Sequence, residues 1–155
     1  MKILKILGLA VLAAAVFVAL SAPIGPVPGF FIGGESTPAP TTWPDTSNVH
    51  EIKLKVPGTL PRVVTIWVID HEGELHVVGS RESGWVTMIG EGSPVEMRIE
   101  DKTYALNAIP VTDGWQAVLE DYVAKYETDY PEIIAGFPKV EEARDAVAVF
   151  RLSRG

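Results

Sequence analysis

Three histidines are the residues with the clearest capacity for metal binding or proton transfer: His50, His71 and His76. No pair of them has the spacing that places two imidazoles on one face of a helix, so we expect no metal site. His71 falls in an expected turn. His76 lies in mid-strand between Leu75 and Val77. Two interpretations of it stay open: a ligand to haem or another cofactor, or a hydrogen-bonded side chain of the core.

Other catalytic signatures are missing from the sequence. It contains no cysteine, which excludes thiolate metal sites and cysteine nucleophiles. The Gly-x-Ser-x-Gly elbow, the Walker phosphate loop and the dinucleotide-binding fingerprint are also absent. Glu72, Glu74 and the pair Glu141-Glu142 are more typical of a solvated turn and a helix start than of acid–base groups. Trp67 and Trp85 could stack on a planar ligand, although large aromatic side chains in a small domain more often belong to its core.

The composition limits the partners of the protein. The chain has 155 residues, which is room for one domain, and 13 basic against 20 acidic residues give a net charge of −7. Binding to nucleic acid needs clustered Lys and Arg, so we expect no nucleic-acid partner.

The N-terminal segment has the pattern of a membrane-directing sequence. Lys2 and Lys5 precede an apolar run from Ile6 to Leu20, whose length falls between a signal-peptide core and a transmembrane helix. One interpretation is a signal-anchor that lies in the cell membrane through residues 6–24, as a single-pass protein with its N-terminus inside and its C-terminal domain exported. The other is a signal peptide cleaved near Ser21, which gives a secreted or periplasmic protein.

The chain divides into three predicted regions. They are the signal-anchor or signal peptide at 1–24, a Pro/Gly-rich tether at 25–49, and the folded domain at 50–155. Proline removes backbone donors and fixes φ, so the tether is expected to be extended. In the tether, Trp43 and the pair Phe30-Phe31 could lie against the membrane or another subunit.

The folded domain is expected to be rich in strands. Alternating or β-branched runs predict the strands Glu51–Val56, Val63–Asp70, Leu75–Gly79, Val95–Ile99, Thr103–Val111 and Ala146–Leu152. The sequence His71-Glu72-Gly73 is expected to turn the chain into a hairpin, and Glu100-Asp101-Lys102 makes a second turn.

One amphipathic helix is predicted before the last strand. Its apolar stripe has three-and-four spacing and consists of Trp115, Val118, Leu119, Tyr122, Val123, Tyr126 and Tyr130. Asp113 is the expected N-cap, with Gln116 three residues on, and Pro131 is expected to stop the helix. Ile133 to Pro138 is expected to form a loop, and Val140 to Asp145 a short helical turn.

This order of elements predicts a mainly β domain of the α+β class. We expect a small antiparallel split β-barrel with one amphipathic helix, preceded by the N-terminal transmembrane or signal helix. A barrel is the economical arrangement because it leaves few exposed strand edges.

Several short motifs between Pro61 and Leu152 add a family resemblance. They are Pro61-Arg62-Val63-Val64, Gly73-Glu74-Leu75-His76-Val77-Val78-Gly79-Ser80, Ser83-Gly84-Trp85, Pro94-Val95, Tyr104 and the aromatic helix. As a set they resemble the flavin-binding split β-barrel superfamily, nearest its deazaflavin-dependent nitroreductase family, which has a pyridoxamine-phosphate-oxidase-like fold.

The resemblance implies a cofactor site after the second hairpin strand, where relatives hold the phosphates of the cofactor. The residues in that place are Ser80, Arg81, Ser83, Gly84 and Trp85, and Trp67 is a candidate to stack on the ring. The chemistry suits a phosphate, because a loop that contains glycine presents N–H groups and arginine can make a bidentate contact.

The chain departs from the family pattern after Trp85. Relatives have an Asn-Leu pair and a short turn, whereas this chain has Met88-Ile89 and a longer turn with Glu91, which would oppose an anion. The basic residues available to the site are Arg62, Arg81 and Arg98.

Two functions are therefore carried forward as hypotheses. The first is a membrane-tethered split-barrel protein that binds FMN, a deazaflavin coenzyme or a similar planar cofactor and acts as a nitroreductase-like oxidoreductase; haem is a less favoured ligand. The second is a non-catalytic split-barrel binding module, or an accessory subunit of a membrane protein complex, which has no cofactor. The resemblance also implies a homodimer as a partner arrangement.

Overall fold

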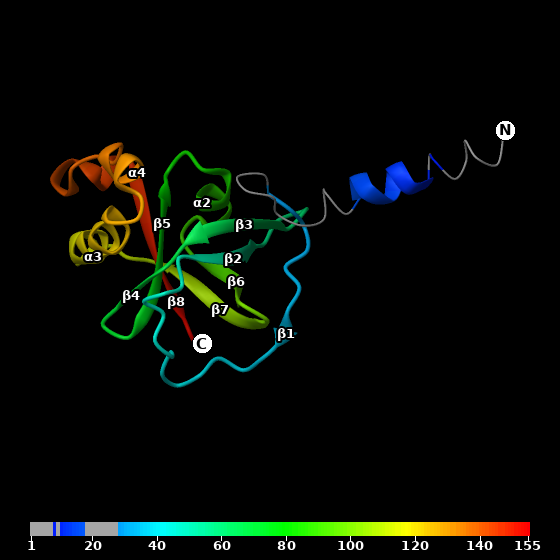
Figure 1. Ribbon diagram of the computed structural model, residues 1–155. Helices are drawn as coiled ribbons and strands as arrows, with labels where there is room; N and C mark the ends of the chain where they lie inside the picture. Colours follow the sequence, from blue (N-terminus) through cyan, green and yellow to red (C-terminus); the bar gives the residue numbers. More distant parts are fainter. Residues whose placement is uncertain (1–7, 9, 18–27) are drawn as a thin grey trace.

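The computed structural model describes residues 8, 10–17 and 28–155, and Figure 1 shows how their elements are arranged. Residues 10–17 are helical and exposed. Within the described ranges, no helix is both long enough and apolar enough to cross a membrane. Most of the expected anchor at 6–24, including Ser21, lies outside the described residues.

The strands of the described chain form one curled sheet, which is antiparallel except at the short strand β1. In chain order they are β1 (Glu35–Ser36), β2 (Glu51–Val56), β3 (Arg62–Trp67), β4 (Ile69–His71), β5 (Glu74–Ser80), β6 (Ser93–Ile99), β7 (Lys102–Pro110) and β8 (Val147–Ser153). Their order across the sheet is β3-β2-β6-β7-β8-β5-β4, and β1 pairs with β7 in parallel.

The two ends of this strand order come from one stretch of chain. β3 and β4 lie at opposite edges of the sheet, yet only Val68 separates them. The sheet must therefore curl until its edges meet, which makes a small barrel. This confirms the antiparallel barrel and the α+β class. The prediction of one unbroken strand over Val63–Asp70 is wrong, because the chain changes partner strand at Val68.

Side chains of a helix bond the backbone where this strand breaks. The Val68 N–H donates to the hydroxyl of Tyr126 at 3.0 Å, and the Val68 carbonyl accepts from Lys125 Nζ at 2.9 Å. A buried backbone group needs a partner, and Val68 is fully buried. The helix thus supplies the bonds that a neighbouring strand would have made.

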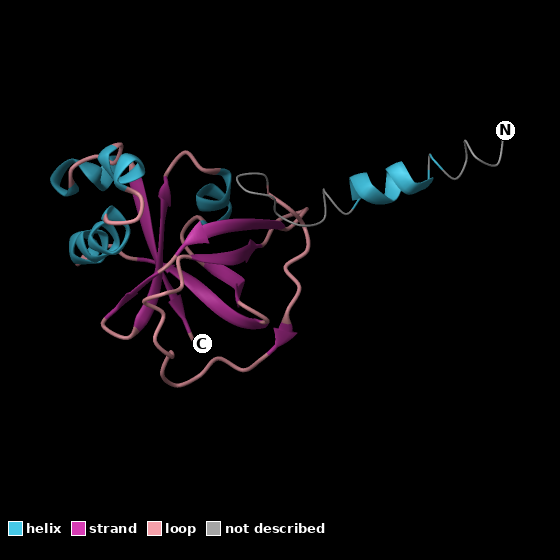
Figure 2. Ribbon diagram, in the orientation of Figure 1, coloured by secondary structure: helices cyan, strands magenta, loops and turns pink. Residues whose placement is uncertain are grey.

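The described domain has more helices than the sequence predicted. They are α2 (Gly84–Ile89), α3 (Trp115–Glu127), α4 (Pro131–Ala135) and the 3₁₀-helix η1 (Val140–Asp145). Figure 2 shows α3 and α4 together on one side of the sheet, away from α2. The long helix and the turn at Val140–Asp145 are confirmed.

As expected, α3 ends before Pro131. Pro131 also occupies the first turn of a further helix, α4, because proline at that position has a suitable φ and needs no N–H partner. Two other local predictions about these helices are wrong. The expected loop from Ile133 begins inside α4. Asp113 does not cap α3. Gly114 takes the N-cap position with φ of 72°, in the left-handed region that favours glycine, and no side chain caps the helix.

The sheet separates two buried clusters. The barrel core lies inside the curl and includes Leu54, Val56, Val77, Met97 and Leu152. The helix-side cluster lies between the outer face of β4, β5 and β8 and the helices, and includes Ile69, Val78, Tyr122, Tyr126 and Val149. Consecutive residues such as Val77 and Val78 enter different clusters, as expected when side chains alternate across a strand.

The described part of the expected tether, from residue 28, packs along the barrel. Gly29 pairs with Val63, Thr103 Oγ1 donates to the Gly33 carbonyl at 2.6 Å, and β1 extends the pairing. Trp43 is only 6% exposed and meets the ring of Tyr104 edge-on at 5.2 Å. Trp43 is therefore part of the core, so its expected contact with a membrane or another subunit is wrong.

Candidate ligand-binding pocket

A pocket of about 330 Å³ lies where the two buried clusters meet. Its walls come from α2, the end of β7, the start of α3, η1 and β8. Apolar groups include Val86 and Phe150 from the barrel core and Trp115 from the helix-side cluster. The volume falls within the range of roughly 300–1,000 Å³ that is typical of small-molecule sites.

Two arginines and one glutamate give this pocket its charge: Arg81, Arg144 and Glu91. The backbone N–H of Arg81 donates to the Ala146 carbonyl at 3.0 Å, and its Nε donates to the Arg144 carbonyl at 2.9 Å. These bonds fix Arg81 beside η1 and leave the terminal guanidinium nitrogens without a partner among the described residues. Both arginines are exposed, so the pocket has cationic groups open to solvent.

Of the predicted cofactor-binding residues, Arg81 lines this pocket. Ser80 ends β5, and its carbonyl accepts from the N–H of Ser83 at 2.9 Å, which makes a turn. Ser83 then precedes α2 without a capping side-chain bond. Gly84 faces Arg62, whose guanidinium would collide with any Cβ at position 84. The segment expected as a loop therefore passes directly into a short helix.

The two predicted tryptophans are committed to packing. Trp85 is 7% exposed, lies in the barrel core and packs so closely on Gly79 that a Cβ there would collide with its ring. The ring of Trp67 stacks on that of Tyr126, with centroids 4.2 Å apart and planes 12° apart. Neither tryptophan lines the pocket, and the aromatic rings that do are Trp115 and Phe150.

Sequence reasoning missed Trp115 and Phe150 as pocket residues for a physical reason. Trp115 belongs to the apolar stripe of the helix, and Phe150 alternates along the last strand, so both patterns indicate only core. β8 inserts between β7 and β5, and this long-range pairing brings the two rings to one pocket. No local signal in the sequence carries that information.

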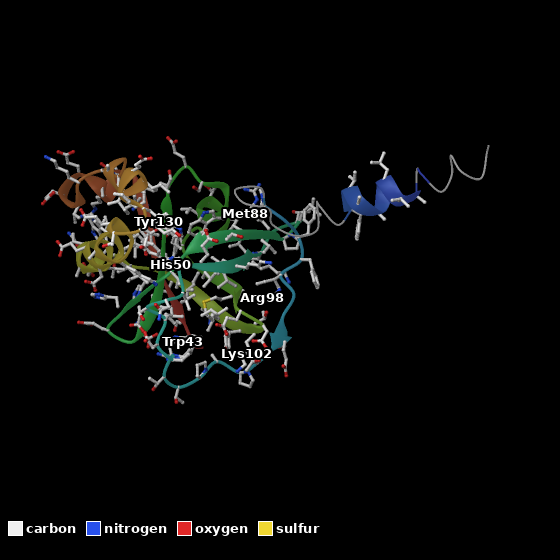
Figure 3. All side chains as sticks on the ribbon, in the orientation of Figure 1. Trp43, His50, Met88, Arg98, Lys102 and Tyr130 are labelled. Carbon is white, nitrogen blue, oxygen red and sulfur yellow. The ribbon has the colours of Figure 1, made fainter. Side chains whose placement is uncertain are left out.

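The remaining basic candidates are engaged elsewhere. Arg98 donates from Nη1 to the Ile32 carbonyl at 2.9 Å and from Nε to the Glu100 carbonyl at 2.7 Å. Figure 3 shows Arg98 on the barrel side, well away from Tyr130. Arg98 therefore holds the segment around Ile32 against the barrel. Arg62 lies against Gly84 and does not line the pocket.

His76 is a buried strand residue beside a different pocket. It is 5% exposed, its Nδ1 lies 2.9 Å from the Glu74 carbonyl, and burial lowers the pKa of its imidazole. That second pocket, which His71 also lines, shares residues 110–112 with the first pocket and is therefore adjacent to it. The expected position of His76 in a strand is confirmed.

The helix-side cluster contains polar groups with strong structural bonds. Lys125 Nζ donates to the carbonyls of Thr46, Val49 and Val68 at 3.1, 2.8 and 2.9 Å. Burial lowers the pKa of Lys125 and raises the pKa of Tyr122 and of Tyr126. His50 and Tyr130 lie next to each other at the edge of this cluster, with ring centroids 5.9 Å apart (Figure 3).

Comparisons with known proteins give distant structural likenesses. No family model and no curated protein matches this chain. The chain is similar to a NimC/NimA family protein from Clostridium acetobutylicum, at 20% identity over 66% of this chain and 73% of the other, with a TM-score of 0.48. It is also similar to HutZ, the heme storage protein from Vibrio cholerae, at 14% identity over 70% and 85% of the two chains, with a TM-score of 0.49. Likenesses of this size assign no family, ligand or activity to the chain.

Proposed function

We propose that the protein binds a planar, anionic cofactor in the pocket between α2, α3, η1 and β8. The observation that carries this proposal is the pairing of aromatic walls, Trp115 and Phe150, with the exposed guanidiniums of Arg81 and Arg144. A planar ring gains from contact with apolar and aromatic side chains, and a phosphate gains from charged hydrogen bonds. The chain as a whole is acidic, so two arginines at one pocket are a specific attraction for an anion.

FMN and deazaflavin coenzymes fit this chemistry, because each joins a flat ring system to phosphate. The aromatic walls would hold the ring, and Arg81 and Arg144 would hold the phosphate. A bound flavin or deazaflavin would supply hydride transfer, as in a nitroreductase-like oxidoreductase. Haem is favoured less, because His76, the residue considered as its ligand, lines the neighbouring pocket.

We further propose that the domain is tethered to the cell membrane by residues 6–24 and faces the outside. The supporting pattern is Lys2 and Lys5 followed by an apolar run. Cleavage near Ser21 is the alternative, and it would release a secreted or periplasmic protein. A homodimer and a membrane complex remain the proposed partner arrangements.

A non-catalytic binding module is the second candidate function. The observation in its favour is that Trp67, Trp85 and Arg98, all considered for the cofactor, are engaged in packing or backbone contacts. A module of this kind would bind none of the redox cofactors.

The experiment that separates the two candidates is a cofactor titration of the full chain in mild detergent. FMN, a deazaflavin coenzyme and haem are added in turn, and binding is followed by visible absorption while circular dichroism reports the fold. We expect saturable binding of FMN or deazaflavin with one site per chain. Failure of all three to bind to folded protein would overturn the redox proposal and leave the binding module.

Arginine variants then locate the site. Arg81→Ala should weaken the cofactor by about 1–3 kcal/mol, as expected for a lost charged hydrogen bond. Arg62→Ala is the matched control, because Arg62 lies near α2 but outside the pocket. Equal weakening by both substitutions would place the phosphate at the start of α2 instead.

A further inference from the structure

The second pocket, of about 440 Å³, brings together two of the three histidines in the sequence. His71 and His76 both line it, with carboxylates of Glu72 and Asp113 and the guanidinium of Arg151 also on its walls. The apolar part of the wall comes from residues 109–111 and Val118.

The hairpin between β4 and β5 sets the relative position of the two imidazoles. Its two-residue turn, Glu72-Gly73, has positive φ at both positions, 54° and 81°, as in a type I′ turn. This turn pairs His71 with Glu74 and Ile69 with His76. His71 and His76 are then diagonal neighbours on one face of the hairpin, and their ring centroids lie 5.8 Å apart.

Hydrogen bonds fix the same tautomer in both rings. His71 Nδ1 lies 2.6 Å from Asp121 Oδ2 on α3, and His76 Nδ1 lies 2.9 Å from the Glu74 carbonyl oxygen. An ionised carboxylate and a carbonyl only accept, so Nδ1 is the donor in each ring. In a neutral ring, Nε2 then keeps its lone pair, and no described residue bonds to either Nε2. A carboxylate or carbonyl behind Nδ1 is the usual arrangement behind a metal-binding histidine.

The separation of the ring centres is compatible with both imidazoles binding one ion. A metal–nitrogen bond of about 2.1 Å places the ion roughly 3.2 Å from the centre of an imidazole, so two rings on one ion lie at most about 6.4 Å apart. The observed 5.8 Å is within this limit. A tetrahedral angle would bring the centres to about 5.2 Å, a change that small side-chain rotations can make.

The third histidine, His50, differs from His71 and His76 in the partners of its ring nitrogens. His50 has partners at both nitrogens: Nδ1 lies 3.4 Å from the Tyr130 hydroxyl, and Nε2 lies 3.4 Å from Asp129 Oδ2. His50 also lines none of the walls of this pocket. It is therefore a control that the sequence itself provides.

We propose that His71 and His76 bind one divalent transition-metal ion of borderline softness, Cu²⁺ or Zn²⁺, through their Nε2 atoms. Imidazole suits these ions better than Mg²⁺ or Ca²⁺, which prefer oxygen. The described residues contain no group of three or more side chains that would enclose a metal ion. Two positions on the ion stay open to water or a small ligand, and Glu72 and Asp113 offset the charge of Arg151 across the pocket.

The test is calorimetric titration of the full chain with CuCl₂ and with ZnCl₂ in a weakly coordinating buffer. We expect one ion per chain and tighter binding of Cu²⁺ than of Zn²⁺. His71→Ala should weaken binding at least tenfold, and Asp121→Ala, which removes the acceptor behind His71, by about tenfold to a hundredfold. His50→Ala should leave the affinity within twofold of the parent protein.

Spectroscopy on the Cu²⁺ form gives a second readout that does not depend on affinity. Electron paramagnetic resonance should show coupling to two imidazole nitrogens, and one in His71→Ala. His76→Ala should also leave one coupled nitrogen. If His76→Ala fails to fold, His76→Gln takes its place with the same expected result. No binding by the parent protein, an unchanged affinity in folded His71→Ala, or a loss in His50→Ala equal to that in His71→Ala would each overturn the proposal.

Discussion

The barrel core and the helix-side cluster are both closed to solvent, but different chemistry closes them. In the barrel core, aliphatic side chains from alternating strand positions meet, as at Leu54, Val77 and Met97. In the helix-side cluster, three of the ten buried residues are aromatic, and the hydroxyl of Tyr126 and the ammonium of Lys125 bond directly to backbone groups. The barrel core is stabilised by the apolar surface area that it removes from water. The helix-side cluster is stabilised in addition by hydrogen bonds at specific positions.

This difference explains where a ligand can enter. Trp85 is held by the barrel core, and Trp67 is stacked on a tyrosine of the helix-side cluster. Neither ring lines the junction pocket, although the sequence marks both as candidates. The pocket lies at the junction of the two clusters, where Phe150 of the barrel core and Trp115 of the helix-side cluster both line its walls.

The largest expected effect is the loss of an aliphatic side chain from the barrel core. Leu54 is fully buried, so Leu54→Ala should lower the free energy of unfolding by about 2–5 kcal/mol. Leu60→Ala is the control with the same chemistry, because Leu60 is 70% exposed and should change stability by roughly 0.5 kcal/mol or less. Urea denaturation measures both. Similar losses in the two variants would contradict the account of the barrel core.

A smaller effect should follow from removing one hydroxyl from the helix-side cluster. Tyr126→Phe leaves the N–H of Val68 without its partner at the strand break, which should cost about 1–3 kcal/mol. Tyr122→Phe is the matched control, because the Tyr122 hydroxyl has no hydrogen bond to a described residue. If Tyr126→Phe and Tyr122→Phe unfold at the same urea concentration, the hydrogen bonds of the Tyr126 hydroxyl do not stabilise the helix-side cluster.

The smallest effect is a difference in alkaline sensitivity. Burial raises the pKa of Tyr122 and Tyr126 in the folded state, so their stabilisation is present below about pH 10 and is lost as the pH rises further. Each tyrosine contributes at most about 1.4 kcal/mol per pH unit to this fall. Lys125, whose pKa is lowered by burial, acts in the opposite direction below its ordinary pKa of 10.5.

Tyr122→Phe should therefore lose stability less steeply than the parent protein above pH 10.5, in urea titrations at closely spaced pH values. Leu60→Ala, which changes no titrating group, should keep the parent slope. Parallel curves for Tyr122→Phe and the parent protein would show that burial of this hydroxyl does not govern the alkaline response.

The helices and strands of the fold could largely be predicted from the sequence, but few of its long-range contacts could. Alternation located β2, β6 and β7, and the three-and-four stripe located α3, because these signals lie within one element. The break at Val68 was not predictable, since it depends on Tyr126 and Lys125 from a helix some 57 residues later along the chain. Pro131 was ambiguous, because proline can end one helix or begin another.

The same limit applies to the residues of the candidate site. The family resemblance placed Arg81 among the expected phosphate-binding residues, and Arg81 lines the pocket. Arg144, Trp115 and Phe150 reach the pocket through the pairing of β8 between β7 and β5, which local patterns do not encode. The sequence did not predict His71 and His76 as a metal-binding pair because only a helical spacing was considered, whereas a two-residue turn brings them together.

The most direct test of the central claim, that the junction pocket binds a planar anion, compares FMN with riboflavin on the full chain. The two ligands share the ring and differ by the phosphate. Fluorescence titration should give a dissociation constant for FMN at least tenfold lower than for riboflavin, and Arg81→Ala with Arg144→Ala should abolish that preference while weak ring binding remains. Equal affinities for FMN and riboflavin, or a preference for FMN that survives the loss of both arginines, would contradict the assignment of this pocket.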